Sequence, residues 1–167
     1  IRYYDNMIKK YGVNLHLNTK ATIENLLAGN YDEIILATGV TPRKMDMEGI
    51  DHPKVLDYVD VLSKKVEVGK RVAIIGAGGI GFDVAEYLSH DMAHESVSLN
   101  VENYMKEWGV DMTYQRGGSL AESPQPLPSP REIFLLKRSK GKHGKNLGKT
   151  TGWIHRASLS MKQVKMI

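Results

Sequence analysis

The residues with the clearest chemical potential are closely spaced glycines near the middle of the chain. Gly76, Gly78 and Gly81 have the G-x-G-x-x-G spacing, and Gly79 and Ile80 lie between the last two. In this motif the first glycine permits a tight turn, the second lets the backbone approach a pyrophosphate, and the third allows close packing of helix on strand. Unpaired N–H groups at the helix start then attract the phosphates. We therefore expect all five residues to take part in binding a dinucleotide.

The motif requires a strand before it and a helix after it, and the sequence predicts both. The apolar run 72–75 is typical of a buried strand, and Ile80, Val84 and Leu88 recur at helical spacing. This order of elements predicts an α/β fold, with a Rossmann-like parallel sheet flanked by helices.

A second strand is predicted over 132–136, and a group of cations follows it. Lys137, Arg138 and Ser139 occupy the place where NAD-binding units carry an Asp or Glu that accepts hydrogen bonds from the ribose 2′-hydroxyl. No carboxylate is present here, and Arg138 can hold a 2′-phosphate through two parallel hydrogen bonds. The sequence therefore favours NADPH over NADH, with Arg138 as the main contact, Lys137 and Ser139 as secondary contacts, and Lys140 as a weaker one.

A long insertion separates the first helix from the second strand. Residues 89–131 contain one predicted helical face and then a Gly- and Pro-rich loop, which we expect at the surface. A helix is predicted over 153–163, and a third strand begins at Lys165. The NADPH-binding domain, itself truncated, is therefore expected to cover residues 67–167.

Residues 1–66 have a different predicted order of helices and strands. An amphipathic helix opens the segment, and a short strand is predicted over 13–17. The stretch 32–39, whose residues 34–37 are apolar, predicts a buried strand that ends in a glycine turn at Thr38 and Gly39.

Composition bounds the class of protein. The 167 residues include no cysteine, which excludes disulfides, thiolate nucleophiles and Cys-ligated clusters among them. No apolar run approaches the roughly 20 residues of a membrane span, and the first residues lack a signal peptide. We therefore expect a cytoplasmic protein with no membrane partner. Because the chain opens on Ile1 in place of Met and stops as a strand begins, we expect a fragment.

Three further groups of residues allow other interpretations. The basic run 137–149 could be a solvated loop or a nucleic-acid patch, but it contains no aromatic residue for base stacking, so no nucleic-acid partner is expected. His90 and His94 have the spacing of a metal pair without a third ligand, and we interpret them as surface residues. The third group, Trp153, His155 and Arg156, follows the loop. It is interpreted either as a packed ring with two surface cations or as a set of neighbours of the cofactor.

Two motifs in order resemble the flavoprotein pyridine-nucleotide reductases. They are the segment 34–39, with its Ala-Thr-Gly end, and the glycine fingerprint 76–81. A longer similarity, covering nearly all of the chain, is to the bacterial NADPH-dependent 2,4-dienoyl-CoA reductases. It is carried by four stretches: 49–56, 78–83, 107–111 and 147–156.

This resemblance implies an FAD domain interrupted by an NAD(P)H domain. Residues 1–66 would be a partial FAD-binding domain and linker, with Thr38 and Gly39 as the remnant of FAD binding. The complete enzyme would reduce 2,4-dienoyl-CoA esters in unsaturated fatty acid β-oxidation, using NADPH, FAD, a [4Fe-4S] cluster and FMN in that order. The chain alone would be inactive, and its partners would be the remaining FAD and FMN-barrel domains.

Two alternatives stay open at this point. A related amine dehydrogenase of the same superfamily would have a second nucleotide site that holds ADP or is silent, which Lys137, Arg138 and the intact glycines argue against. A non-catalytic domain that keeps the nucleotide fold for docking would fold correctly and bind no NADPH.

Overall fold

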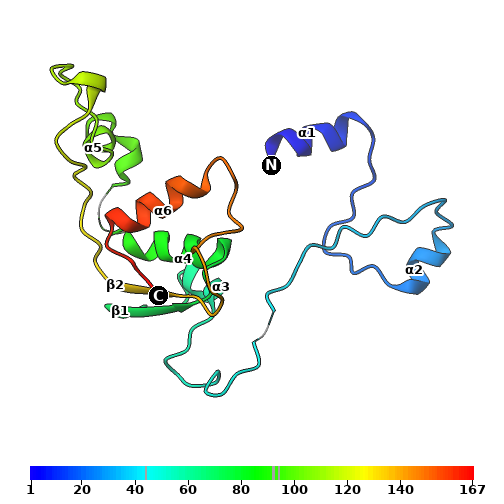
Figure 1. Ribbon diagram of the computed structural model, residues 1–167. Coiled ribbons are helices and arrows are strands. Elements are labelled where there is room, and N and C mark those ends of the chain that lie inside the picture. The colour runs from blue at the N-terminus through cyan, green and yellow to red at the C-terminus, as the bar shows by residue number, and fades with distance from the viewer. Residues whose placement is uncertain (44, 92, 94) are drawn as a thin grey trace. The chain divides into compact units, whose positions relative to one another are not determined.

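The computed structural model describes residues 1–43, 45–91, 93 and 95–167, so that His94 lies outside the described residues. It contains two compact units, Ile1–Asp46 and Met47–Ile167. Figure 1 labels α1 and α2 of the first unit, and α3 to α6, β1 and β2 of the second. None of the helices in these ranges combines the length and the apolar character that crossing a membrane requires.

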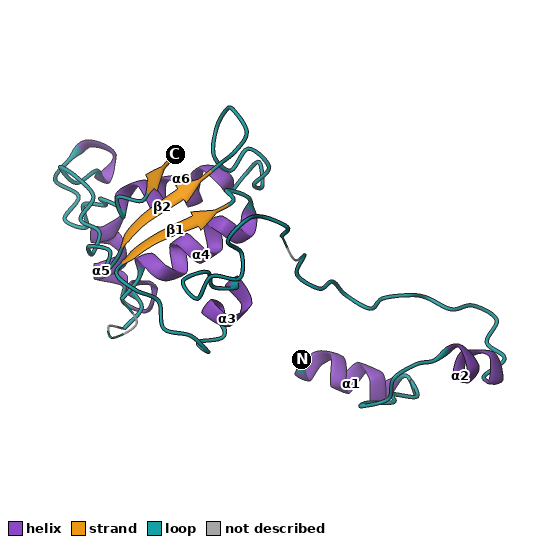
Figure 2. Cartoon of the chain, turned by 90° about the horizontal axis from the view of Figure 1, so that it is seen from below, coloured by secondary structure: helices purple, strands orange, loops and turns teal. Residues whose placement is uncertain are grey.

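The unit Met47–Ile167 is built on a parallel sheet whose strands lie in the order β1–β2–β3 (Figure 2). The bounds of the strands are β1 (Arg71–Ile75), β2 (Glu132–Leu136) and β3 (Lys165–Met166). The register sets Val72 beside Ile133 and Ile74 beside Leu135. Since side chains alternate along a strand, these four point to the same face of the sheet. All three strands lie where the sequence predicts them.

Two helices cover that face. α4 (Gly79–Ser89) follows β1, and α6 (Gly152–Met161) precedes β3, and the two helices contact each other. The short helix α3 (Tyr58–Leu62) contacts α4. The core they enclose consists of residues that are at most 3% exposed, namely Phe82, Ala85, Leu88, Ile133, Leu135 and Leu159. Burial of each large apolar side chain stabilises the fold by about 1.5–3 kcal/mol. The predicted α/β class, a parallel sheet flanked by helices, is confirmed.

The insertion 89–131 contains helical segments of its own. They are η1 (Val97–Leu99), α5 (Val101–Glu107) and η2 (Gly117–Ser119). Lys162, at the end of α6, joins the insertion to the core: its ammonium lies 3.1 Å from a carboxylate oxygen of Glu107 and donates to the Leu127 carbonyl at 2.9 Å. The Lys162 side chain is only 2% exposed, so a buried ion pair holds the insertion at this point.

The unit Ile1–Asp46 contains α1 (Arg2–Lys10) and α2 (Ile23–Ala28). The strands predicted over 13–17 and 32–39 are wrong, because the described residues of this unit form no strand. Ile35 is 88% exposed and Leu36 is 81% exposed. An apolar run becomes a strand only when a neighbouring strand pairs with its backbone, and within this unit no described segment does so.

Glu132 opens β2 between two cations. It lies beside Arg71 in the sheet register, with Arg71 Nε 3.1 Å from its carboxylate. The ammonium of Lys165 donates a hydrogen bond to the same carboxylate. That hydrogen bond, together with the attraction of Lys165 and Arg71, holds the pKa of Glu132 below its ordinary value of 4.5.

A carboxylate whose pKa is lowered by folding stabilises the fold above its unfolded-state pKa, and loses that effect as the pH falls through its folded-state pKa. We expect Glu132→Gln to lower the urea midpoint slightly at about pH 7, because the exposed group is screened by solvent. The difference from the wild-type chain should shrink at about pH 3. Urea titrations at both pH values check this, and an equal difference at the two would contradict it.

Candidate functional site

The glycine turn between β1 and α4 has the backbone shape that the motif predicts. Gly76 has a φ of +114°, a conformation that side chains disfavour, and its N–H donates to the Leu136 carbonyl at 3.0 Å. The turn therefore lies against the end of β2. A Cβ atom added at Gly76, Gly78 or Gly79 would meet no atom within 4 Å. The surface of the turn is open, as close approach of a phosphate requires.

The third glycine of the motif sets the distance between helix and turn. A Cβ atom at Gly81 would lie 1.8 Å from the Gly76 carbonyl oxygen, so only glycine fits there. Gly78 is the N-cap of α4, and among the described residues no side chain caps it. The first N–H groups of the helix are thus left for an anion. Ile80 belongs to this first turn, and its side chain is half exposed at 52%.

A cavity of about 440 Å³ lies against this turn. The residues that line it are Gly76, Ala77, Gly78, Lys137, Arg138, Ser139, Lys140, Lys145 and Asn146. The predicted cations therefore lie on the same cavity as the first two glycines of the motif. The cavity is at the carboxyl ends of β1 and β2, where parallel α/β sheets bind their ligands. Gly79, Ile80 and Gly81 begin the helix next to it and do not line it.

The cavity is strongly cationic. Among the described residues that line it, four are Lys or Arg and none is Asp or Glu. One of these cations is already engaged within the loop: Lys137 donates to the Lys142 carbonyl at 2.9 Å and lies 3.5 Å from the Lys140 carbonyl. Lys137 therefore shapes the loop that presents Arg138 and Ser139.

Three lining residues are absent from the sequence-based prediction, namely Ala77, Lys145 and Asn146. Ala77 lies inside the glycine motif. Lys145 and Asn146 belong to the basic loop, which folds back through Gly141 (φ +100°) and Gly144 (φ +66°). The two glycines were the available signal, because a loop with two such residues can reverse direction within a few positions.

The group after the loop does not line the cavity. Trp153 is 58% exposed, so the interpretation as a packed ring is wrong for it. His155 Nδ1 lies 3.2 Å from a Glu86 carboxylate oxygen, and Arg156 donates to the Gly144 carbonyl at 3.4 Å. These contacts give His155 and Arg156 structural roles between α4, α6 and the loop.

The remaining predicted residues lie elsewhere. Thr38 and Gly39 are exposed residues of the other unit, and their role in FAD binding stays a prediction. His90 Nδ1 lies 2.8 Å from the Glu86 carbonyl oxygen. Within the described ranges, no three His, Cys, Asp or Glu side chains are arranged to hold a metal ion.

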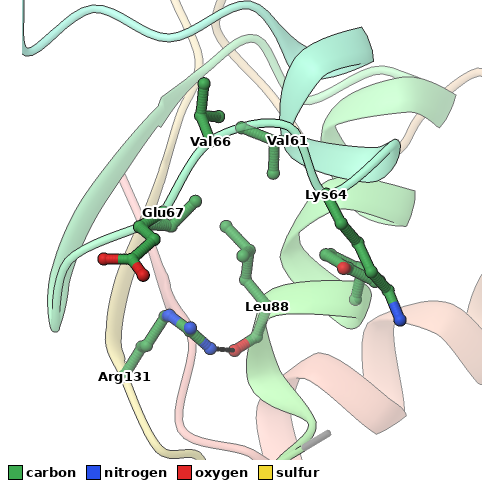
Figure 3. A pocket seen from close by; sticks show the side chains of 8 residues that line it. Val61, Lys64, Val66, Glu67, Leu88 and Arg131 are labelled. Atoms are coloured by element: carbon green, nitrogen blue, oxygen red, sulfur yellow. Dashed lines mark hydrogen bonds between the residues drawn. The ribbon is translucent and has the colours of Figure 1, made fainter.

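A second cavity, of about 400 Å³, lies at the opposite, amino ends of the strands (Figure 3). Glu67, Leu88 and Arg131 are among the residues that line it. Arg131 donates to the Leu88 carbonyl at 3.2 Å, while its buried Nε meets no acceptor among the described residues. The described lining of this cavity includes one carboxylate, Glu67, beside two cations, Lys64 and Arg131, whereas that of the glycine cavity includes four cations and no carboxylate. The glycine cavity is therefore the better candidate for a phosphate.

Comparison with known proteins shows similarity to an oxidoreductase family and to several reductases. The sequence pattern of the pyridine nucleotide-disulphide oxidoreductase family matches residues 2–105. The chain is 40% identical over 88 residues to a cinnamate reductase of Clostridium sporogenes, which covers 53% of this chain and 13% of the relative. It is 35% identical over 107 residues to a bilirubin reductase of Mediterraneibacter gnavus, covering 64% and 17%.

Two further similarities extend over nearly the whole chain. A metal reductase of Desulforamulus reducens is 27% identical over 173 residues, covering 99% of this chain and 24% of the relative. A solved structure of 2-naphthoyl-CoA reductase with 2-naphthoyl-CoA has a TM-score of 0.59 at 27% identity, covering 99% of this chain and 19% of that one. The chain thus spans between 13% and 24% of the length of these curated relatives. Because the family pattern matches more than half of its residues, the chain belongs to the pyridine nucleotide-disulphide oxidoreductases, a family whose cofactors are FAD and a nicotinamide nucleotide.

Proposed function

We propose that this chain is the NADPH-binding electron-input module of a flavin-dependent reductase. One observation carries the proposal: an open glycine turn and a group of cations, free of carboxylates among the described lining residues, share one cavity. NADH would require a hydrogen-bond acceptor for its 2′-hydroxyl at the end of β2, whereas the extra phosphate of NADPH requires cations.

Each part of the cavity has a task in this proposal. The open surface at Gly76 and Gly78 admits the diphosphate, and the N–H groups at the start of α4 bind its oxygens. The Arg138 guanidinium holds the 2′-phosphate through paired hydrogen bonds. Ser139 adds a hydroxyl to the same wall, and Lys137 keeps the loop folded around both.

The nicotinamide nucleotide, when bound, would supply a hydride to FAD. We propose 2,4-dienoyl-CoA esters as the substrate of the whole enzyme, with FMN and a [4Fe-4S] cluster as its further cofactors. The four similar stretches along the chain support this choice, as does the similarity to a 2-naphthoyl-CoA reductase, whose substrate is named as a CoA ester. Thr38 and Gly39 would contribute to FAD binding in that enzyme.

Titration of the chain with the two reduced nucleotides tests the proposal. We expect NADPH to bind about 100-fold more tightly than NADH, because one phosphate held by a guanidinium contributes about 2.7 kcal/mol. Nicotinamide fluorescence on addition of protein reports both affinities. Equal affinities would contradict the preference. Absence of binding by a folded chain would instead favour a scaffold, or the silent second site of an amine dehydrogenase.

A further inference from the structure

The basic loop after β2 is anchored to the glycine turn. The Gly144 N–H donates to the Ala77 carbonyl at 3.3 Å, and Arg156 donates to the Gly144 carbonyl at 3.4 Å. Gly144 is buried, and a Cβ atom there would lie 2.9 Å from the Phe82 ring. Since Phe82 is itself only 1% exposed, the loop is held against the core at this residue.

This anchor determines where the next residue lies. Ala77 is the residue between Gly76 and Gly78, so Gly144 is bonded to the centre of the turn that is to receive the diphosphate. Lys145 follows Gly144 directly and lines the cavity with these glycines. Arg138, by contrast, lies two residues beyond the end of β2, on the side where the ribose is read.

The charge of Lys145 is available to a ligand. Its side chain is exposed, and within the described part of the chain no carboxylate forms an ion pair with it. The sequence contains no Asp or Glu from residue 133 to the end, and none of the described residues that line the cavity is acidic. Lys137, in comparison, is engaged by loop carbonyls.

We propose that Lys145 is a further cofactor-binding residue, which neutralises the diphosphate of the dinucleotide. The inference rests on the proposed function and assigns different parts of the nucleotide to different residues. Arg138 distinguishes NADPH from NADH, whereas Lys145 binds the part that the two nucleotides share. A compact ammonium suits the diphosphate as a point charge, and the planar guanidinium suits the terminal 2′-phosphate.

Substitution of Lys145 separates the two roles. Lys145→Gln is expected to weaken NADPH and NADH binding by the same factor of about ten, so that the ratio of the two affinities is unchanged. Lys145→Arg, which keeps the charge, should retain most of the affinity for both. The matched control is Lys149→Gln, which removes a charge from the same loop outside the cavity lining and should leave both affinities within about twofold.

Two results would overturn the inference: unchanged affinities in Lys145→Gln, or a loss confined to NADPH, which would make Lys145 a second 2′-phosphate contact. Circular dichroism of each variant confirms that the fold is intact. If the wild-type chain binds neither nucleotide, the proposed function itself fails. If the wild-type chain and the Lys145→Gln variant bind NADPH equally well, only the role of Lys145 fails.

Discussion

Gly81→Val is expected to destabilise the unit Met47–Ile167 by about 3 kcal/mol and to abolish nucleotide binding with it. The added Cβ would lie 1.8 Å from the Gly76 carbonyl oxygen and 2.9 Å from its carbonyl carbon. These are backbone atoms of a turn bonded to β2, so neither can rotate away as a flexible side chain would. The first turn of α4 would have to move off the sheet. Urea unfolding followed by circular dichroism measures the loss.

Gly78→Ala is the matched control, because it adds a methyl group to the same turn where no atom lies within 4 Å. Gly78 also has a φ of −88°, which alanine adopts without strain. This variant should therefore unfold at nearly the wild-type urea concentration, and yet bind NADPH poorly, since the methyl group occupies the approach of the diphosphate. Equal stability of Gly81→Val and Gly78→Ala would contradict the conclusion that close packing of the helix on the turn requires glycine at position 81.

Arg138→Ala is expected to weaken NADPH binding about 100-fold and to leave NADH binding nearly unchanged. Two charge-assisted hydrogen bonds to the 2′-phosphate are lost, and NADH has no such phosphate. The two affinities should then become nearly equal. Nucleotide titrations of the variant, compared with the wild-type chain, measure this ratio directly.

Arg138→Lys tests the geometry of the same contact. Lysine keeps the charge but cannot form paired, planar hydrogen bonds, so an intermediate preference for NADPH is expected. A wild-type ratio in Arg138→Ala would show that the preference for NADPH comes from the other cations of the cavity.

The unit Met47–Ile167 is the part of the fold that the sequence predicts well. Its strands β1 and β2 each contain four consecutive apolar residues, its α4 helix has a clear period, and the turn between β1 and α4 is fixed by glycines close together in the chain. Such signals are local, because each depends on residues within one turn or one strand. The position of Arg138 beside the turn follows from the parallel pairing of β1 with β2.

The sequence-based prediction fails where structure depends on distant partners. The run 32–39 has the composition of a buried strand, but composition does not specify a neighbour, and Ile35 and Leu36 are exposed in the unit Ile1–Asp46. Lys145 is absent from the prediction for a related reason. Gly141 and Gly144 indicate that the loop can turn, but they do not specify where it packs. That depends on contacts of Gly144 with Ala77 and Phe82, which lie far away in the chain.

The buried ammonium of Lys162 has a consequence for how this type of chain can vary in length. Because its partners, Glu107 and the Leu127 carbonyl, both belong to the insertion 89–131, removal of that segment would leave a buried positive charge without these partners. A shortened relative would have to exchange the lysine for an apolar residue at the same time. Length at one point of the chain and residue type at position 162 are therefore expected to change together.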